Sequence, residues 1–178
     1  YLNKNNFSNE WLDARDCIIT DNTYREANIN WDLTERLVKR RVEELQKRSN
    51  LIITQGFIGA TSENFTTTLG REGSDYTAAI FSYCLNAEEM IVWKDVPGVL
   101  SADPKYYRDS IRLQEISYHD AIELTYYGAT VIHPKTIKPL ENKNIQLQVR
   151  SFISPKFLVT ILLRYPPASR MMPLNLNL

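Results

Sequence analysis

Short apolar segments alternate with helical patterns along this chain of 178 residues, and this alternation limits its fold more than any other feature. Short segments rich in apolar residues lie at residues 51–54, 90–93 and 145–149. Runs of this kind are typical of strands that are covered on both faces, as in parallel sheets. The sequence therefore predicts an α/β fold, built from βαβ units around a mostly parallel sheet.

The helix with the clearest pattern spans about residues 32–48, where apolar side chains form one stripe and charged side chains the opposite one. Asp32 is expected to cap this helix, and Glu35, three residues later, to close a capping box. Further elements are expected as follows: a strand over 17–20, a helix after Ser74 and Asp75, a helix over 118–127 capped by Ser117 and ended by Gly128, and a helix from Pro134.

Charge and composition exclude several classes of function. The 21 basic residues balance the 21 acidic ones, so no net field attracts the chain to nucleic acid or to an anionic membrane. Two cysteines, Cys17 and Cys84, lie in apolar runs, and only two histidines occur, which argues against a disulfide framework and a multi-histidine metal site. No apolar stretch is long enough to span a bilayer, and no signal-peptide pattern opens the chain. We expect a cytoplasmic protein with no membrane partner.

Glycine and polar residues gather at three places where a predicted strand ends, which is where open α/β sheets bind ligands. The first place, residues 53–59, carries Gly56 and Gly59, which let backbone N–H groups approach an anion; an ordinary turn is equally consistent. Another, residues 93–105, contains turns at Pro97-Gly98 and Asp103-Pro104, and by propensity alone it is a loop.

The remaining stretch, residues 66–75, has the densest chemistry. It combines three threonine hydroxyls, two glycines, the Arg71 guanidinium and a Ser74-Asp75 pair at a predicted helix start. We favour an anion site, because Arg can bind a carboxylate or phosphate with two hydrogen bonds and helix N-termini attract negative charge. The alternative is an ordinary helix start with Arg71 in a surface ion pair.

Four motifs follow one another in a distinctive order and spacing. They are Thr-Gln-Gly-Phe-Ile-Gly from Thr54, Thr-Thr-Thr-Leu-Gly-Arg-x-Gly-Ser-Asp-Tyr-Thr-Ala-Ala from Thr66, Asp-Val-Pro-Gly-Val-x-x-x-Asp-Pro from Asp95, and Tyr-Gly-Ala-x-Val-Ile-His-Pro-x-Thr from Tyr127. Together they closely resemble the motifs of aspartate kinases in the amino acid kinase family, and the resemblance covers about residues 11–153.

This resemblance implies a three-layer α/β/α sandwich and an ATP- and Mg²⁺-dependent transfer of the γ-phosphoryl group to the side-chain carboxylate of L-aspartate. The product would be 4-phospho-L-aspartate, in the first step towards lysine, threonine and methionine. ATP and L-aspartate are the implied partners, and we expect a homo-oligomer. Such a reaction depends on cations that position two anions and needs no covalent enzyme intermediate. We therefore expect structural roles for Cys17, Cys84, His119 and His133.

The resemblance also implies roles for individual residues. Arg71 would hold a substrate carboxylate, and Ser74 and Phe57 would line the same pocket. Asp75 would be the catalytic residue, orienting cationic groups around the transferred phosphoryl group. ATP contacts carry over to six residues: Lys94, Asp95, Leu100, Lys105, Thr130 and Val131. No residue is assigned as a metal ligand.

The chain departs from the family pattern in several respects. It does not begin with Met, and it has neither the opening Lys-Phe-Gly-Gly strand of aspartate kinases nor their upstream Glu. We therefore interpret residues 1–155 as the second, nucleotide-side half of a kinase domain, with little or no activity alone. Residues 156–178 would form a tail of unknown role in place of ACT regulatory modules. Within the motifs, Thr130 replaces the usual Lys, and Glu72 replaces the usual Gly.

Two other interpretations stay open. Another member of the amino acid kinase family would phosphorylate a carbamate, an acetylglutamate or a nucleoside monophosphate. A non-catalytic fragment would keep only nucleotide binding or oligomerisation.

Overall fold

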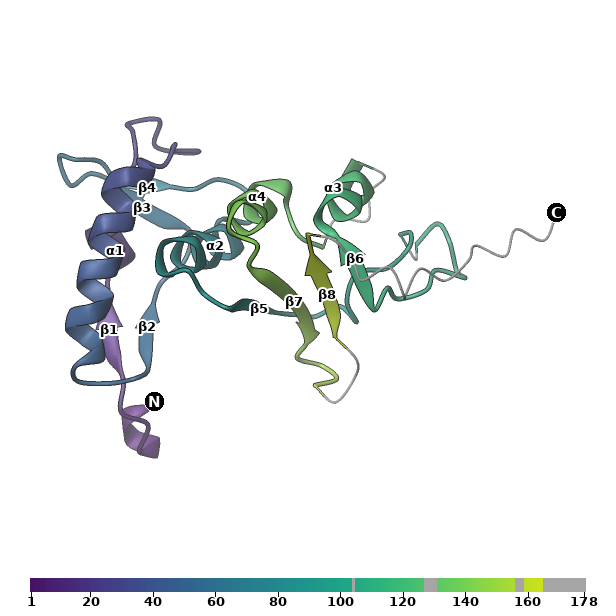
Figure 1. The fold of residues 1–178 in the computed structure, drawn as a ribbon, viewed down its shortest axis with the longest axis horizontal. Coiled ribbons are helices and arrows are strands. Elements are labelled where there is room, and N and C mark those ends of the chain that lie inside the picture. The colour runs from purple at the N-terminus through teal and green to yellow at the C-terminus, as the bar shows by residue number, and fades with distance from the viewer. Residues whose placement is uncertain (104, 127–130, 156–158, 165–178) are drawn as a thin grey trace. The chain divides into compact units, whose positions relative to one another are not determined.

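The computed structural model describes residues 1–103, 105–126, 131–155 and 159–164, which fall into two units, Tyr1–Ala87 and Glu88–Leu178 (Figure 1). Helices and strands alternate in both units, so the predicted α/β class is confirmed. Among the described strands, three of the five pairings are parallel. None of the described helices is long and apolar enough to cross a membrane.

The first unit is built from two strand pairs and two long helices. Strands β1 and β2 pair in parallel, with Leu12 opposite Thr54, whereas β3 and β4 pair antiparallel. Its core forms where Val38 and Val42 of α1 pack with Ile80 and Cys84 of α2. The elements are η1 Asn3–Asn5, β1 Glu10–Leu12, η2 Ala14–Asp16, α1 Trp31–Gln46, β2 Ile52–Thr54, β3 Ile58–Ala60, β4 Thr66–Thr68 and α2 Gly73–Leu85.

Helix α1 confirms the predicted amphipathic helix but not its predicted cap. The cap is Asn30, which has an extended backbone and accepts a hydrogen bond from the Leu33 N–H at 3.2 Å. Asp32 lies one residue inside the helix, so it cannot be the N-cap. Glu35 forms an ion pair with Lys39 at 2.8 Å. The predicted capping box is therefore wrong, because the chain already enters the helix at Trp31.

The segment 17–20 is not the regular strand that the sequence predicts. It makes single bridges only, between Ile19 and Ala60 and between Thr20 and Ile29. Its close approach to β3 depends on Gly59, where a Cβ atom would lie 2.8 Å from the Ile18 carbonyl oxygen.

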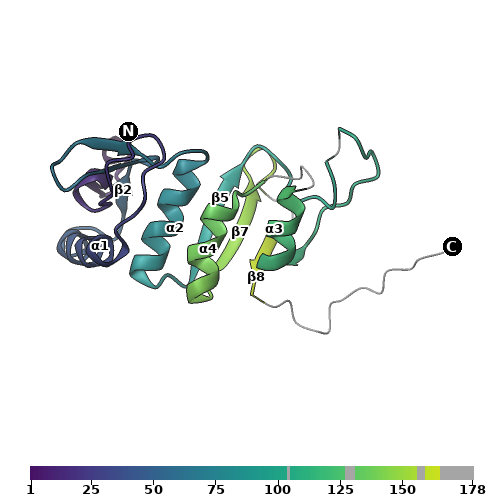
Figure 2. The same ribbon diagram turned by 90° about the horizontal axis from the view of Figure 1, so that it is seen from above.

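The second unit is a four-stranded mixed sheet in the order β5-β7-β8-β6. Only the central β7–β8 pair is antiparallel. Helices α3 and α4 contact each other and lie on one face of this sheet (Figure 2). The elements are β5 Glu89–Lys94, β6 Glu115–Ser117, α3 Tyr118–Tyr126, α4 Pro134–Lys143, β7 Gln146–Ser151 and β8 Thr160–Leu163.

Both helix starts in this unit are as predicted. The Ser117 hydroxyl accepts a hydrogen bond from the Asp120 N–H at 3.0 Å at the start of α3. His133 caps α4 by accepting from the Lys135 N–H through Nδ1 at 3.1 Å, with Pro134 in the first turn. The predicted end of α3 at Gly128 lies outside the described residues.

The strands differ from the expectation of coverage on both faces. Leu147, Gln148 and Val149 of β7 are buried, which fits a covered central strand. Strand β5 instead alternates, because Met90 and Val92 are buried while Ile91 and Trp93 are 37% and 50% exposed. Strand β8 lies between β7 and β6, in a segment where the sequence analysis predicted no element.

Candidate active-site residues

The residues predicted for the site form two groups, one in each unit. Phe57, Arg71, Ser74 and Asp75 belong to the first unit, and the predicted ATP contacts belong to the second. Of those contacts, Lys94, Asp95, Leu100, Lys105 and Val131 are described, and Thr130 lies outside the described residues.

The first group is organised by the start of α2. The chain turns into this helix through Gly70 and Glu72, whose φ angles of 81° and 53° are left-handed. The N–H of Gly73 then donates to the Gly70 carbonyl at 3.1 Å. Glycine adopts this conformation most easily, so the turn suits the Gly that the resemblance implies at position 72 better than it suits Glu72.

Phe57 is held against this helix start. Its N–H donates to the Thr77 hydroxyl at 2.9 Å, and its carbonyl accepts from the Leu69 N–H at 2.9 Å. Its own φ is 76°, an uncommon left-handed value for a bulky residue. A Cβ atom on Gly73 would lie 2.6 Å from Phe57 Cδ2, so only glycine permits this contact. The structure therefore places Phe57 beside the first turn that carries Ser74 and Asp75.

The Gly56 position has a similar explanation. A Cβ atom there would lie 2.9 Å from Ser74 Cα, so glycine is required for the loop to pack on α2. Gln55, Gly56 and Ser74 also line a groove of about 500 Å³, together with apolar side chains of α1, β2 and α2.

The side chains at the start of α2 include both a positive and a negative charge. Arg71 is exposed and forms no ion pair with any residue that the structure describes. Ser74 is also exposed, whereas Asp75 is half-buried with its Oδ2 atom buried. A guanidinium beside a helix N-terminus favours an anionic ligand.

The threonine run before this turn makes contacts within the protein. Residues 66–68 form β4, and the buried Thr67 hydroxyl is hydrogen-bonded to the Thr20 hydroxyl at 2.7 Å. The Thr68 hydroxyl is directed to the carbonyls of Tyr24 and Arg25 at 3.1 and 2.8 Å. Two of the three hydroxyls in this run therefore bind the protein itself.

The second group begins at the carboxyl end of β5. Lys94 is the last residue of that strand, and its carbonyl accepts from the Phe152 N–H, just beyond β7, at 3.0 Å. Asp95 follows it and is exposed. Because β5 and β7 are parallel, these residues lie at the sheet edge where α/β proteins bind ligands.

The loop after Asp95 folds back on itself as a hairpin. The Leu113 N–H donates to the Val99 carbonyl at 2.9 Å, and the Ser101 N–H donates to the Ile111 carbonyl at 2.8 Å. Leu100 bridges Arg112 within this hairpin. The predicted ATP contact at Leu100 therefore lies within these backbone pairings.

Strand β8 anchors that hairpin through Thr160, which the sequence analysis did not single out. The buried Thr160 hydroxyl accepts from the Val99 N–H at 3.1 Å and donates to the Leu113 carbonyl at 2.6 Å. Gly98 allows this approach, because its φ is 132° and a Cβ atom there would lie 2.6 Å from Thr160 Oγ1. A threonine inside a short apolar run gives no sequence signal for such a contact.

The other two described ATP contacts lie at loop positions. The Lys105 N–H donates to Asp103 Oδ1 at 2.9 Å, and Lys105 is exposed. The predicted turn at Asp103-Pro104 includes Pro104, which lies outside the described residues. Val131 is half-buried and lies just before the His133 cap of α4.

A polar cluster at the ends of β1 and β2 was not predicted. The Asp13 carboxylate accepts bidentate hydrogen bonds from the Arg15 guanidinium, at 3.0 Å from Nε and 2.6 Å from Nη2. It accepts a further hydrogen bond from Gln55 Nε2 at 2.5 Å. These donors lower the pKa of the Asp13 carboxyl from 3.8 to about 2, and the Arg15 hydrogen bond is the largest cause. Asp13 follows the carboxyl end of β1, which is where a ligand-binding or polar cluster is expected. Strand β1 has only three residues, so no strand pattern is recognisable there in the sequence.

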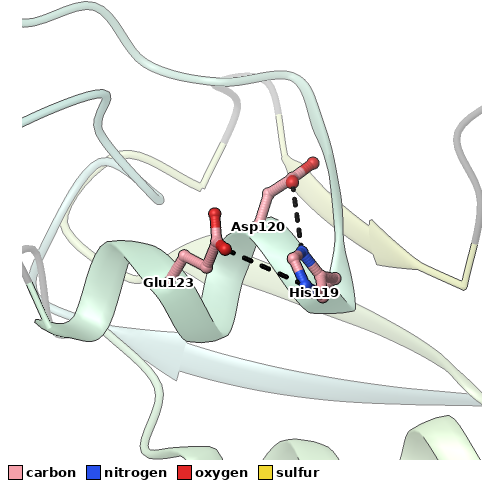
Figure 3. A group of neighbouring side chains, drawn as sticks. All are labelled: His119, Asp120 and Glu123. Carbon is pink, nitrogen blue, oxygen red and sulfur yellow. Dashed lines mark ion pairs between the residues drawn. The ribbon is translucent and has the colours of Figure 1, made fainter.

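One group of described side chains has metal-ligand types close together, on the exposed first turns of α3 (Figure 3). His119 Nδ1 lies 3.7 Å from Asp120 Oδ1, and His119 Nε2 lies 3.8 Å from Glu123 Oε1. Carboxylates at this end of a helix stabilise it by complementing its dipole. All three side chains are exposed, and none of them belongs to the predicted site.

The two cysteines are buried within the core of the first unit. Burial raises the pKa of the Cys17 thiol to about 11, so it is protonated at neutral pH. A protonated buried thiol is a poor nucleophile, in agreement with the expected structural role.

Comparison with known families decides the relationship of this chain. The family described as "Amino acid kinase family" matches residues 1–151. The chain belongs to the amino acid kinase family. Among its relatives, the bifunctional aspartokinase/homoserine dehydrogenase 2 of Arabidopsis thaliana is 37% identical over 159 residues, which are 88% of this chain and 17% of that protein.

Other members of the amino acid kinase family give the same result. The lysine-sensitive aspartokinase 3 of Escherichia coli is 36% identical over 173 residues, which are 94% of this chain and 38% of that protein. The crystal structure of E. coli aspartokinase III in complex with aspartate and ADP aligns with a TM-score of 0.87 at 33% identity, covering 94% of this chain and 37% of that one. The resemblance to aspartate kinases is thus confirmed, and the chain spans well under half the length of these relatives.

Proposed function

We propose that this chain is part of an aspartate kinase that transfers the γ-phosphoryl group of ATP to the side-chain carboxylate of L-aspartate. The product would be 4-phospho-L-aspartate, on the route to lysine, threonine and methionine. The observation that carries this proposal is the start of α2, where Arg71, Ser74 and Asp75 gather beside Phe57. The relatives support it, because one of them was crystallised with aspartate and ADP.

In this proposal the first unit binds the acceptor. The exposed Arg71 guanidinium binds a carboxylate of aspartate, which suits its planar pair of N–H donors. Ser74 and Phe57 line the pocket. Asp75 is the catalytic residue, and its carboxylate orients the cationic groups that stabilise the charge of the transferred phosphoryl group.

The second unit binds the nucleotide, through Lys94, Asp95, Leu100, Lys105, Thr130 and Val131. The described residues fit an ATP-binding role, since two lysine ammonium groups and the anchored hairpin follow the carboxyl end of β5. Carboxylate oxygens, such as those of Asp95, are the donors that Mg²⁺ prefers. When bound, Mg²⁺ neutralises the charge of the phosphates. The lysines and the hairpin then fix the position of the nucleotide.

We further propose the following organisation. Residues 1–155 are the second half of a catalytic domain, and residues 156–178 have no assigned role beyond the strand β8. The protein acts in the cytoplasm as a homo-oligomer, with no nucleic-acid partner. The isolated chain has little or no kinase activity, because it spans only 17% and 38% of the two aspartokinase relatives compared above.

The first experiment is calorimetry of Mg²⁺-ATP binding to the 178-residue chain and to Asp95→Ala. We expect saturable binding that Asp95→Ala weakens. Asp109→Ala is the matched control, because Asp109 is also an exposed aspartate of the same loop region. No binding by a chain that circular dichroism shows to be folded would contradict the nucleotide-binding role.

A second experiment identifies the acceptor. The full-length protein is assayed for ADP formation with L-aspartate, N-acetyl-L-glutamate, carbamate and UMP. We expect turnover with L-aspartate only, and loss of that turnover in Arg71→Ala. Preference for another acceptor would assign the chain to a different branch of the family.

A further inference from the structure

The carboxyl ends of β1 and β2 are joined by a network of three polar side chains. Asp13 and Gln55 follow the paired strand residues Leu12 and Thr54, so the parallel pairing sets them side by side. Both ends of the Gln55 amide are used, because Nε2 donates to Asp13 Oδ1 at 2.5 Å and Oε1 accepts from the Ala14 N–H at 3.2 Å. Gln55 therefore has one orientation as long as Asp13 accepts its hydrogen bond.

Arg15 holds Asp13 in place from the other side. Its Nε and Nη2 atoms reach both carboxylate oxygens, at 3.0 and 2.6 Å, and its Nη1 lies 3.4 Å from the Thr66 hydroxyl. The Asp13 carboxylate thus binds a guanidinium and an amide together. Bidentate, charge-assisted hydrogen bonds of this kind fix the orientation of the carboxylate as well as stabilise the contact.

The network continues directly into the loop beside α2. Gly56 follows Gln55 and packs on Ser74, and Phe57 follows Gly56 with its strained φ of 76°. Left-handed backbone at a bulky residue costs about 1–3 kcal/mol and persists only where surrounding contacts impose it. Here the Phe57 backbone is held by the Thr77 hydroxyl and the Leu69 N–H, and Gln55, two residues earlier, is held by Asp13.

Stability alone does not account for this arrangement. The Asp13 and Arg15 side chains are 24% and 46% exposed, and such surface ion pairs add only about 0–1 kcal/mol. Asp13 also caps the short helix η2 through the Arg15 N–H at 2.9 Å, but that cap needs no contact with Gln55. What the contact with Gln55 adds is a fixed position for the loop that carries Phe57.

We propose that Asp13, held by Arg15, is a positioning residue for the acceptor substrate, because it fixes Gln55 and thereby sets Phe57 and Ser74 at the start of α2. This inference rests on the proposed function, in which Phe57 and Ser74 line the aspartate pocket. Asp13 acts through Gln55 and does not touch the substrate. It therefore controls how well the pocket is formed, and the nucleotide contacts are independent of it.

The first test measures the loop itself in the 178-residue chain. The variant is Asp13→Asn, which keeps the shape but removes the charge that binds Arg15. We expect amide hydrogen exchange at Phe57 to become about tenfold faster, the equivalent of one lost charge-assisted hydrogen bond, with exchange at Ala79 and Ile80 unchanged. Asp21→Asn is the matched control, because Asp21 also accepts from a neighbouring amide, Asn28, at 2.7 Å. Equal exchange at Phe57 in both variants would overturn the proposal.

The second test measures the acceptor kinetics of the full-length protein. Asp13→Asn should raise the KM for L-aspartate about tenfold, leave the KM for ATP unchanged, and change kcat less than the KM for aspartate. A purely structural role would lower activity without this split, and would contradict the proposal. If the wild-type protein does not phosphorylate aspartate at all, the proposed function fails. The exchange experiment still decides whether Asp13 positions the loop.

Discussion

At the scale of single residues, Glu72 occupies a backbone position that suits glycine. Its φ of 53° is left-handed, and its side chain makes no capping hydrogen bond to α2. We predict that Glu72→Gly is more stable than Glu72→Ala by about 1 kcal/mol, because alanine keeps the strained conformation and glycine relieves it. Comparing these two variants removes the effect of the lost charge. Urea unfolding measures the difference, and equal midpoints for the two variants would contradict it.

Asp13 makes the stability of the chain depend on pH in a defined window. Its pKa is lowered from 3.8 to about 2, chiefly by the hydrogen bond from Arg15, so the folded state binds fewer protons than the unfolded state between those values. The stabilisation is complete above about pH 4 and is lost as the pH falls towards 2. We predict that the difference in unfolding free energy between the wild type and Asp13→Asn shrinks over this range.

The measurement is urea unfolding at several pH values between about 7 and 2.5. Asp21 also has a pKa of about 2, because Asn28 donates to it, but it is present in both proteins and cancels in the comparison. A difference that stays constant with pH would show that Asp13 has an ordinary pKa in the folded chain.

At the scale of elements, β8 stabilises the hairpin of the second unit through one hydroxyl. We predict that Thr160→Val, which keeps the shape, lowers the unfolding free energy by about 1–3 kcal/mol, because it leaves the buried Val99 N–H and Leu113 carbonyl without this partner. Mg²⁺-ATP affinity should fall as well. Thr125→Val is the control, since the Thr125 hydroxyl donates at 2.6 Å to the Ile122 carbonyl of its own helix α3. Equal effects of the two substitutions would contradict the anchoring role.

The sequence predicts the helices of this fold better than its strands. The period of α1 and the caps of α3 and α4 are local features, and the structure confirms them, apart from the exact cap at Asn30. Strands β1, β3, β4 and β6 have only three residues each, which is too short for an alternating pattern to show. Their pairing is decided by distant residues, as between Leu12 and Thr54.

The candidate site shows the same division between local and distant information. The motif around Arg71 places Ser74 and Asp75 at a helix start, and the structure has α2 begin there. The contacts that shape this place were not predictable, because Gln55 meets Asp13 across 42 residues and Thr160 meets Val99 across 61. Such contacts depend on which strands become neighbours, and a single sequence gives no direct signal for that.

At the scale of the whole molecule, activity depends on how much of the proposed kinase the chain contains. Phosphoryl transfer requires the donor and the acceptor to be held in line while cations neutralise their charge, so partial sets of contacts lose most of the rate. The chain spans 38% of the E. coli aspartokinase to which it is similar. Binding of a single ligand therefore requires fewer of these contacts than turnover does.

We predict that the 178-residue chain forms ADP from ATP and L-aspartate at least about 10³-fold more slowly than the full-length protein, because correct positioning accounts for rate factors of this size. A coupled assay of ADP release measures both proteins at equal concentration. The full-length Asp75→Asn variant sets the background, since it keeps the side-chain shape and removes the proposed catalytic carboxylate. A chain whose rate equals that of the full-length protein would show that the catalytic contacts all lie within residues 1–178. A chain at the background rate that still binds Mg²⁺-ATP would instead show that nucleotide binding and turnover need different lengths of the protein.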